Sequence, residues 1–264
     1  MATVNDIVNF LETLAPQSAK MEWDNVGLLC GRQMQPVRKI LVALDPFYHV
    51  CEEAKEIGAD LIVTHHPLIF RPVKSDTDSN DTGKSLLYLM SNGIAAINAH
   101  TNLDVYPGGV NDCLAAKLGL QNIEVVCPDG YTQSGEPWGL LRKGTVTKQE
   151  LQAFLAVVRD TLGCPGLRYV DSGKPVETVA VGGGSCASEL YQAVQAGCDT
   201  FITADVKYTQ FWDAKNAGIN LIDAGHFYTE NPVCQYLVDK LQAAFPDVMT
   251  VVSKKHTDCA KFFM

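Results

Sequence analysis

An internal repeat limits what this chain can fold into more than any other feature of its sequence. A shift of 139 residues lays residues 39–67 on residues 178–206 without a gap. Within this match, GADLIVT at 58–64 meets GCDTFIT at 197–203. Each copy has a strand-like apolar run, a helix-like stretch that ends at glycine, and a second strand-like run. A βαβ pattern therefore occurs twice.

The repeat continues past these segments with a smaller offset. The shift falls from 139 to 125, and GIAAINA at 93–99 then meets GINLIDA at 218–224. The difference of 14 residues is close to the length of the polar loop 68–83 in the first copy. Two unrelated βαβ units could match by chance. The ordered agreement over four elements favours a real duplication.

Strands and helices are predicted to alternate along most of the chain. This alternation is typical of an α/β sandwich whose sheets are largely parallel and covered by helices. Together with the repeat, it predicts two similar α/β/α domains related by internal duplication, with a cleft between them. We expect the first domain at 1–125 and the second at 126–264, with an approximate boundary, because residues 128–145 are rich in Gly, Pro and polar residues.

Composition excludes several classes of partner. The chain has 264 residues, 47% of them hydrophobic, and a net charge of −9, which repels phosphate backbones and makes nucleic acid an unfavourable partner. No apolar run approaches the roughly 18 residues of a membrane span, and the first residues lack the features of a signal peptide. Nine cysteines are scattered without a C-x-x-C pair, a pattern typical of reduced thiols. We therefore expect a cytoplasmic protein without a membrane partner.

Two adjacent histidines stand where an α/β sheet collects its ligands. His65 and His66 follow the apolar run 61–63, and Pro67 ends the strand there. Because adjacent strand residues point to opposite faces, both rings can reach one metal centre only if the chain turns. The geometry is easier if each ring binds a different ion. The alternative is that the two rings cap the strand by hydrogen bonds.

The repeat indicates which other residues could join the histidine pair. Asp104 lies just beyond the strand that follows in the first half. In the second half the pair is replaced by Ala204 and Asp205, so one half-site has been lost, but the next strand ends before His226, with Glu230 four residues later. If the halves face each other across a pseudo-two-fold axis, these side chains meet His65 and His66 in the cleft between the domains.

Three imidazoles and two carboxylates form a mixed donor set that suits Zn, Fe, Mn or Ni. Five ligands are too many for one open catalytic zinc. They suit two divalent metal ions per chain that share a bridging carboxylate. The loop 68–83 begins next to the histidine pair, and we expect it to be mobile, so that it could act as a lid. The alternative is a surface loop with no part in the site.

Two glycine-containing motifs have less demanding explanations. Gly83-Lys84-Ser85 resembles the tail of a Walker loop, but Asp78 stands where glycine is needed, so a helix start is favoured. The run GGGS at 182–185 could cradle a phosphate, although a tight structural turn is favoured. Cys186 is a poor candidate nucleophile because no histidine is placed beside it in the sequence.

These residues resemble motifs of the GTP cyclohydrolase I type 2 homologs, also called Nif-three-like proteins. The resemblance runs through nearly the whole chain and rests on WDNVGL at 23–28, THHPL at 64–68, HTNLD at 100–104, GGVND at 108–112, GH at 225–226 and TE at 229–230. The chain looks like the short form, because the segment between Gly119 and Trp138 has no room for the extra domain of longer members.

The resemblance implies two α/β domains with a dinuclear metal site at their interface. The residues that match the family's ligands are His65, His66, Asp104, His226 and Glu230. Glu230 is the one expected to bridge the ions. The resemblance also implies a ring-shaped homohexamer whose sites face the interior.

Two functions are compatible with such a site. The first is a metal-dependent hydrolase that acts on a small nucleotide-like or phosphorylated molecule, in which the ions activate water and polarise the bond under attack. The family name suggests GTP ring opening. The alternative is a non-catalytic metal-binding or metal-responsive assembly protein with a closed site. A ring that clamps DNA is opposed by the negative charge. The sequence assigns no catalytic acid or base.

Overall fold

The computed structural model describes residues 1–263, which divide into two compact units. Unit 1 comprises Met1–Leu103 and Val233–Thr257, and unit 2 comprises Asp104–Pro232 and the chain from Asp258 onward. This division differs from the expected boundary near residue 125. The segment 233–257 returns to unit 1 because its strand pairs with a strand of the first sheet, and Asp104 belongs to unit 2.

Unit 1 contains a five-stranded sheet in the order β1-β4-β3-β2-β13. The strands are β1 (Gly27–Cys30), β2 (Lys39–Ala43), β3 (Leu61–Thr64), β4 (Ala95–Asn98) and β13 (Met249–Val252). All neighbours are parallel except β1, which runs antiparallel to β4. The strands β2, β3 and β4 are almost entirely buried, as the continuous apolar runs predict for a sheet covered on both faces.

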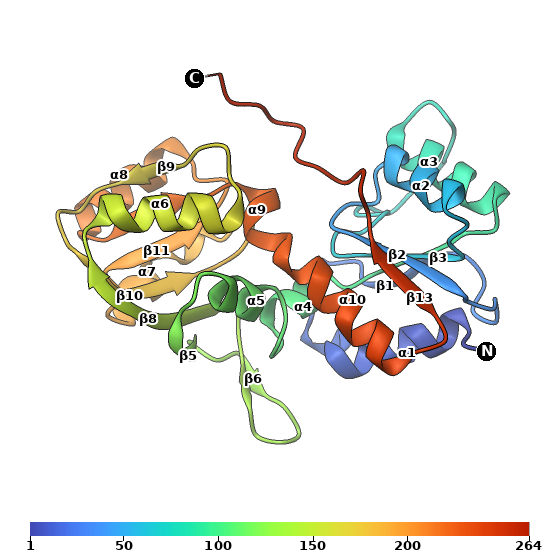
Figure 1. The fold of residues 1–264 in the computed structure, drawn as a ribbon, viewed down its shortest axis with the longest axis horizontal. Helices are drawn as coiled ribbons and strands as arrows, with labels where there is room; N and C mark the ends of the chain where they lie inside the picture. The colour runs from blue at the N-terminus through green and yellow to red at the C-terminus, as the bar shows by residue number, and fades with distance from the viewer. Residues whose placement is uncertain (264) are drawn as a thin grey trace. The chain divides into compact units, whose positions relative to one another are not determined.

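Helices cover both faces of the first sheet (Figure 1). They are α1 (Val4–Leu14), α2 (Tyr48–Glu56), α3 (Asp81–Ser91) and α10 (Pro232–Ala244), with a short 3₁₀ turn η1 (Gln17–Ala19). The short helix α4 (Thr101–Val105) contains the boundary between the two units. One core cluster packs Leu41 and Ile62 of the sheet against α2 and α3. On the other face lie α1 and α10, and the rings of Phe10 and Phe245 meet there edge to face.

Unit 2 contains a six-stranded sheet in the order β5-β8-β10-β11-β12-β9. The strands are β5 (Gln121–Val126), β8 (Leu141–Gln149), β9 (Arg168–Val170), β10 (Val176–Val181), β11 (Thr200–Thr203) and β12 (Asn220–Asp223), and β6 (Gly130–Tyr131) with β7 (Pro137–Trp138) forms a separate ribbon. The three strands β10, β11 and β12 are parallel, whereas β8 and β9 run antiparallel to their neighbours.

The second sheet is also covered on both faces. Its helices are α5 (Val110–Lys117), α6 (Leu151–Leu162), α7 (Leu190–Gln195), α8 (Tyr208–Ala217) and α9 (His226–Glu230), with a 3₁₀ turn η2 (Ala187–Glu189). Val179 and Ile202 pack against α5 and α6 in one cluster. Their sequence neighbours Ala180 and Phe201 pack against α7 and α8 in another, as the alternation of strand side chains requires. The observed fold is therefore α/β, as predicted.

The two sheets match in strand order and in register. The order β1-β4-β3-β2 corresponds to β9-β12-β11-β10, and in both sheets the first strand is antiparallel and the other three are parallel. Ile40 pairs with Leu61 in unit 1, and the residues 139 positions later, Val179 and Thr200, pair in unit 2. The observed elements follow the predicted repeat, while descent from one duplicated unit stays a prediction.

A turn held by an aspartate is repeated as well. Asp60 accepts hydrogen bonds from the backbone N–H groups of residues 38 and 39, at 2.8 and 3.2 Å. Asp199 accepts from residues 177 and 178, at 2.9 and 2.8 Å. These positions again differ by 139. The aspartate shared by the two matching sequences therefore has the same role in each unit. It links the start of β2 to the start of β3 in unit 1, and the start of β10 to the start of β11 in unit 2.

The main difference between the matching segments is the predicted insertion. In unit 1 the chain takes residues 65–80 to pass from β3 to α3, whereas in unit 2 it takes residues 204–207 to pass from β11 to α8. The extra residues fall in the polar loop 68–83, as predicted. Among residues 1–263, no helix combines the length and the apolar character that crossing a bilayer requires.

Candidate metal centre

The histidine pair in unit 1 lies on a turn at the end of β3. The strand ends at Thr64, whose hydroxyl donates a hydrogen bond of 2.7 Å to the carbonyl of His66. This turn brings the rings of His65 and His66 together, with centroids 4.9 Å apart. Adjacent residues of a continuing strand would point to opposite faces of the sheet. Because the chain turns here, the two rings lie on the same side.

One nitrogen of each ring is held by an oxygen acceptor. His65 Nδ1 lies 2.9 Å from the carbonyl oxygen of Ala99, and His66 Nδ1 lies 2.7 Å from Asp45 Oδ1. A carbonyl or carboxylate oxygen can only accept, so Nδ1 carries the proton and Nε2 is the atom that can ligate a metal. A metal-ligating imidazole usually donates its other ring N–H to a carboxylate or carbonyl oxygen in this way. The capping alternative and the ligand hypothesis are therefore compatible, because each uses a different nitrogen.

His100 joins this pair, although sequence reasoning did not assign it as a ligand. Ring nitrogens of His65, His66 and His100 lie within 4.8 Å of one another. His100 Nδ1 lies 2.8 Å from Asp24 Oδ1, so this ring is anchored in the same way. The available signal was that Asp24 and His100 belong to two of the motifs that carry the family resemblance.

Asp24 is held as an anion beneath this ring. Burial opposes its ionisation, but hydrogen bonds from His100 and Thr101 outweigh that penalty and lower the pKa of the Asp24 carboxyl. The backbone N–H of Thr101 donates at 3.0 Å to the second carboxylate oxygen. The negative charge of Asp24 therefore stabilises a proton on His100 Nδ1 and keeps Nε2 as the lone-pair atom.

Aromatic rings and a cavity lie beside the three histidines. Trp23, 63% exposed, and Phe70, 49% exposed, pack edge to face on each other and on His100, with centroids 5.8–6.3 Å apart. Phe70 belongs to the polar loop, whose Ile69 carbonyl accepts a hydrogen bond of 2.6 Å from Asn25 Nδ2. The loop thus begins at the histidines, as predicted, while its mobility stays a prediction. A cavity of about 410 Å³ lies between His66, this loop and the starts of α2 and α3.

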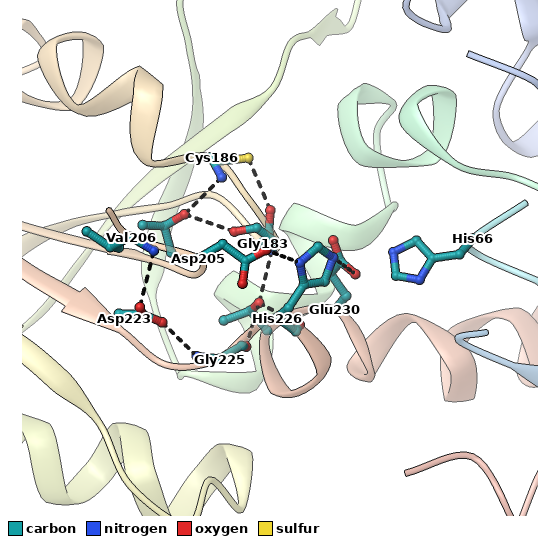
Figure 2. Close-up of polar contacts among 12 residues, drawn as sticks. His66, Gly183, Cys186, Asp205, Val206, Asp223, Gly225, His226 and Glu230 are labelled. Carbon is teal, nitrogen blue, oxygen red and sulfur yellow. Dashed lines mark hydrogen bonds and ion pairs between the residues drawn. The ribbon is translucent and has the colours of Figure 1, made fainter. Parts of the chain in front are cut away.

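In unit 2, His226 and Glu230 occupy one turn of α9. The ring is held at Nδ1 by Asp205 Oδ2 at 2.8 Å, and its Nε2 lies 3.0 Å from Glu230 Oε2 (Figure 2). Asp205 occupies the position that corresponds to His66 in the repeat. The position that lost its histidine therefore supplies the carboxylate that orients another one.

The glycine run 182–184 makes room for these side chains. A Cβ atom on Gly184 would lie 2.0 Å from Glu230 Oε1 and 3.1 Å from His226 Nε2. The N–H groups of this turn already donate inside the protein, from Gly183 to Asn111 Oδ1 at 2.7 Å and from Gly184 to Thr229 Oγ1 at 3.0 Å. These contacts favour the structural turn over a phosphate cradle.

Asp104 follows His100 by one helical turn, on α4. Its backbone carbonyl accepts a hydrogen bond of 3.1 Å from Asn111 Nδ2, so Asn111 links this residue to the glycine turn. Asn111 belongs to the GGVND motif, and the next residue, Asp112, pairs with the buried Arg142 at 2.8 Å. This motif therefore supports the site without supplying a ligand, a role that sequence reasoning missed.

The thiol of Cys186 is affected by the negative charge of this region. Burial raises the pKa of its thiol well above the ordinary value, and the carboxylates of Asp104 and Glu230 raise it further. A thiol in this state is a poor nucleophile. Its Sγ instead donates to the carbonyl of Gly183 at 3.1 Å (Figure 2). The carboxylates of Asp104 and Glu230 both act on this thiol within unit 2.

The five predicted ligands therefore fall into two groups, one in each unit. The unit 1 group is histidine-rich, and the unit 2 group combines one imidazole with two carboxylates. In both groups the histidine rings are anchored through Nδ1. In unit 2, Gly184 also leaves space that any side chain would fill. This donor chemistry fits a borderline first-row divalent ion.

Comparison with known proteins identifies the family. The chain matches the model of the Duf34/NIF3 (NGG1p interacting factor 3) family over residues 2–259, and it belongs to that family. It is 36% identical over 262 residues to the GTP cyclohydrolase 1 type 2 homolog of Clostridium perfringens, covering 98% of this chain and 99% of the relative. It is 33% identical to the homolog of Lactococcus lactis, with 97% of each chain covered.

A solved structure gives the same picture. The Bacillus cereus protein related to NIF3 superposes with a TM-score of 0.94 at 28% identity, covering 100% of this chain and 99% of that one. The resemblance predicted from the sequence motifs is therefore confirmed.

Proposed function

We propose that this protein is a metal-dependent hydrolase that acts on a small nucleotide-like or phosphorylated molecule. In this proposal, two divalent ions about 3.5–4 Å apart are bound by His65, His66, Asp104, His226 and Glu230. The observation that carries the proposal is the shared anchoring of three histidines, each held at Nδ1 by an oxygen acceptor. The name of the relatives, GTP cyclohydrolase 1 type 2 homolog, agrees with it.

The residues of this chain prepare the site by fixing protons and ring orientations. Asp45 and Asp205 hold the Nδ1 protons of His66 and His226, which leaves the lone pair on Nε2. In His226 this Nε2 faces Glu230 Oε2 at 3.0 Å. Glu230 is held in the space left by Gly184 and is the candidate bridging carboxylate. When bound, the metal ions would supply Lewis acidity and lower the pKa of water toward neutrality.

The cavity beside His66 supports catalysis over a closed structural site. Its volume of about 410 Å³ lies within the range of small-molecule sites. The aromatic rings of Phe47 and Phe70 line it together with the carboxylates of Asp45 and Asp81. Flat apolar walls with acceptor oxygens suit a planar ring that carries N–H donors, a description that includes nucleobases. A structural metal site would need no such opening.

We also propose that the chain acts in the cytoplasm as a ring-shaped homohexamer with its sites facing the interior. The family resemblance supports this assembly. Its test is light scattering coupled to gel filtration, which should give six times the chain mass of 28.7 kDa. A monomer or dimer at micromolar concentration would contradict the ring.

Metal analysis followed by a substrate screen tests the proposed function. Protein purified without added metal should carry close to two ions per chain, and metal-loaded protein should hydrolyse members of a panel of nucleotides and phosphorylated small molecules. The Asp104→Asn variant should lose both properties, whereas Asp160→Asn, a matched change on the exposed face of α6, should keep them. Two bound ions without turnover on any substrate would favour the non-catalytic metal-responsive alternative.

A further inference from the structure

The last residues of the chain form one wall of a cavity in unit 2. After β13, the structure describes no further helix or strand up to residue 263 (Figure 1). The chain belongs to unit 2 from Asp258 onward, and we call residues 258–263 the C-terminal tail. Its residues 258, 260 and 262 line a cavity of about 250 Å³ whose other walls include His226 and its anchor Asp205. The tail therefore adjoins the unit 2 group of candidate ligands, although it supplies none of them.

The segment just before the tail is fixed by hydrogen bonds within unit 1. The carboxylate of Glu53 accepts hydrogen bonds from the backbone N–H groups of Lys254 and Lys255, at 2.8 and 3.1 Å. The ring of His256 accepts a hydrogen bond of 3.0 Å at Nδ1 from the backbone N–H of Leu44. The chain is thus held as far as His256, and any movement of the tail begins after this residue.

The tail itself is held much more loosely. No backbone–backbone hydrogen bond joins residues 258–263 to any other part of the described chain. The N–H of Ala260 and the Nζ of Lys261 donate within the tail, to Asp258 Oδ1 at 2.8 Å and to the carbonyl of Asp258 at 3.3 Å. Residues 259–263 are all exposed. A segment with exposed backbone and few buried contacts opens at a low cost in free energy.

Side-chain contacts connect the tail to unit 2. The ring of Phe262, 48% exposed, packs on Gly166, where an added Cβ atom would lie 3.0 Å from Phe262 Cδ1. The next ring, that of Phe263, is fully exposed. Burial raises the pKa of the Tyr228 hydroxyl, and the carboxylate of Asp258, to which this hydroxyl donates a hydrogen bond, raises that pKa further. One apolar and one polar contact therefore hold the tail against the cavity wall.

Closure of the tail has an electrostatic cost that a bound cation would reduce. The tail places the carboxylate of Asp258 in a cavity that already contains the carboxylates of Asp205 and Asp223. Asp223 is neutralised by its ion pair with Arg168, whereas Asp205 pairs with the ring of His226. Like charges in a partly buried cavity repel each other, so a divalent cation held by His226 would favour the closed tail.

We propose that the C-terminal tail is a strap that opens and closes over the cavity beside His226, and that a cation at His226 and closure of the strap favour each other. Phe262 on Gly166 and Asp258 on Tyr228 hold the strap closed. By thermodynamic linkage, closure then strengthens cation binding as much as the cation strengthens closure. The inference rests on the proposed function for the cation, while the contacts of the strap do not depend on it.

A spin label in the tail tests whether these contacts hold it. Cys259 is an exposed thiol of the tail, and Cys127→Ser removes the other exposed thiol, so a nitroxide on Cys259 reports tail mobility in EPR spectra. The ratio of mobile to immobilised label should rise roughly 3–10-fold in Phe262→Ala, the equivalent of half-burying a phenyl ring. Gly166→Val should act in the same direction by filling the space of that ring, since its φ is not left-handed. The matched control Phe263→Ala should leave the ratio unchanged.

Zn²⁺ is the probe for the coupling. Added Zn²⁺ should increase the immobilised fraction of the labelled protein, and His226→Gln should abolish this response. Asp258→Asn should reduce the response, because the neutral amide removes the repulsion that the cation relieves. In the reverse direction, Phe262→Ala should release Zn²⁺ to a chelator roughly 3–10-fold faster than its parent, whereas Phe263→Ala should release it at the parental rate. Circular dichroism of each variant checks that the fold is kept.

The outcomes separate the strap from the proposed function. If Phe262→Ala and Gly166→Val mobilise the label no more than Phe263→Ala does, the strap is wrong and the hydrolase proposal is unaffected. If Zn²⁺ binds but changes neither the spectrum nor its own release rate in these variants, the coupling is wrong. If the tail responds as expected but the wild-type protein hydrolyses no substrate, the inference stands and the proposed function fails. If the wild-type protein binds no Zn²⁺ or other divalent ion, the coupling and the proposed function both fail.

Discussion

The substitution Gly184→Ala offers a direct test of how unit 2 prepares its ligands. Gly184 has φ of +62°, a left-handed conformation that costs a residue with a Cβ about 1–2 kcal/mol. The added Cβ would also lie 2.0 Å from Glu230 Oε1, about 1 Å closer than real contacts allow. The carboxylate therefore has to move by about that amount, and it loses its 3.0 Å contact with His226 Nε2. Changes that disturb the orientation of a metal ligand typically lower metal affinity by about 10–100-fold.

The matched control is Gly163→Ala at the end of α6. Gly163 has φ of +72°, but a Cβ atom added to it would have no other atom within 4 Å. Both variants should lose about 1–2 kcal/mol of unfolding free energy, which thermal unfolding measures. Only Gly184→Ala should also lose metal affinity, by about 10–100-fold, as determined by competition with a chelator. Equal metal content in the two variants would refute the role given to the glycine turn.

Three further changes have defined outcomes. Glu230→Ala should remove metal more completely than Asp104→Ala in elemental analysis, because a bridging carboxylate serves both ions. Equal loss would show that the bridge is misassigned. Asp205→Asn should lower metal affinity by about 10–100-fold by weakening the anchor of His226, and unchanged affinity in a chelator titration would argue against that anchor. Glu53 is buried, and its desolvation is outweighed by hydrogen bonds from the segment after β13, which lower its pKa. Its contribution to stability should therefore be complete above about pH 4.5 and disappear as the pH falls below that value, so Glu53→Gln should destabilise the protein at pH 7 and flatten this acid dependence in denaturant titrations.

Much of the fold could be predicted because the same strand–helix–strand pattern occurs twice in the sequence. The runs 61–64 and 200–203 became β3 and β11, and the smaller shift correctly aligned β4 with β12. The domain boundary could not be predicted in the same way. The short strand β13 lies far along the chain from its partner β2, and nothing in its four residues indicates which sheet it joins. Such non-local pairing leaves little trace in local sequence patterns.

The candidate ligands could be found from strand ends and motifs, but their anchors could not. Asp24 meets His100 across 76 positions of sequence, and Asp45 and Asp205 each meet a histidine across 21. These pairings depend on which strands are neighbours in the sheets. The anchors are therefore a property of the fold. In the sequence, Asp45 and Asp205 were visible only as aspartates that follow apolar runs, and Asp24 only as part of a motif.

The anchors of the two units can be compared position by position through the repeat. This comparison explains why the two groups of ligands differ. Position 45 in unit 1 corresponds to position 184 in unit 2, since the pairs Val42–Val63 and Val181–Ile202 are in the same register. Asp45 anchors His66, but a side chain at 184 would collide with Glu230. The anchor of unit 2 comes instead from Asp205, the counterpart of His66.

On the duplication hypothesis, two unchanged copies would each present a histidine pair backed by an aspartate. Such a protein would offer a histidine pair in each unit but would lack Glu230, the candidate bridging carboxylate. Replacement of the aspartate by Gly184 creates the space for Glu230, and replacement of the histidine by Asp205 keeps His226 oriented. Because each change is useful only in the presence of the other residues of α9, we expect Gly184, Asp205, His226 and Glu230 to depend on one another. Double-mutant cycles on metal affinity within this set should therefore be strongly non-additive, whereas cycles that pair Asp205→Asn with Gly163→Ala should be additive.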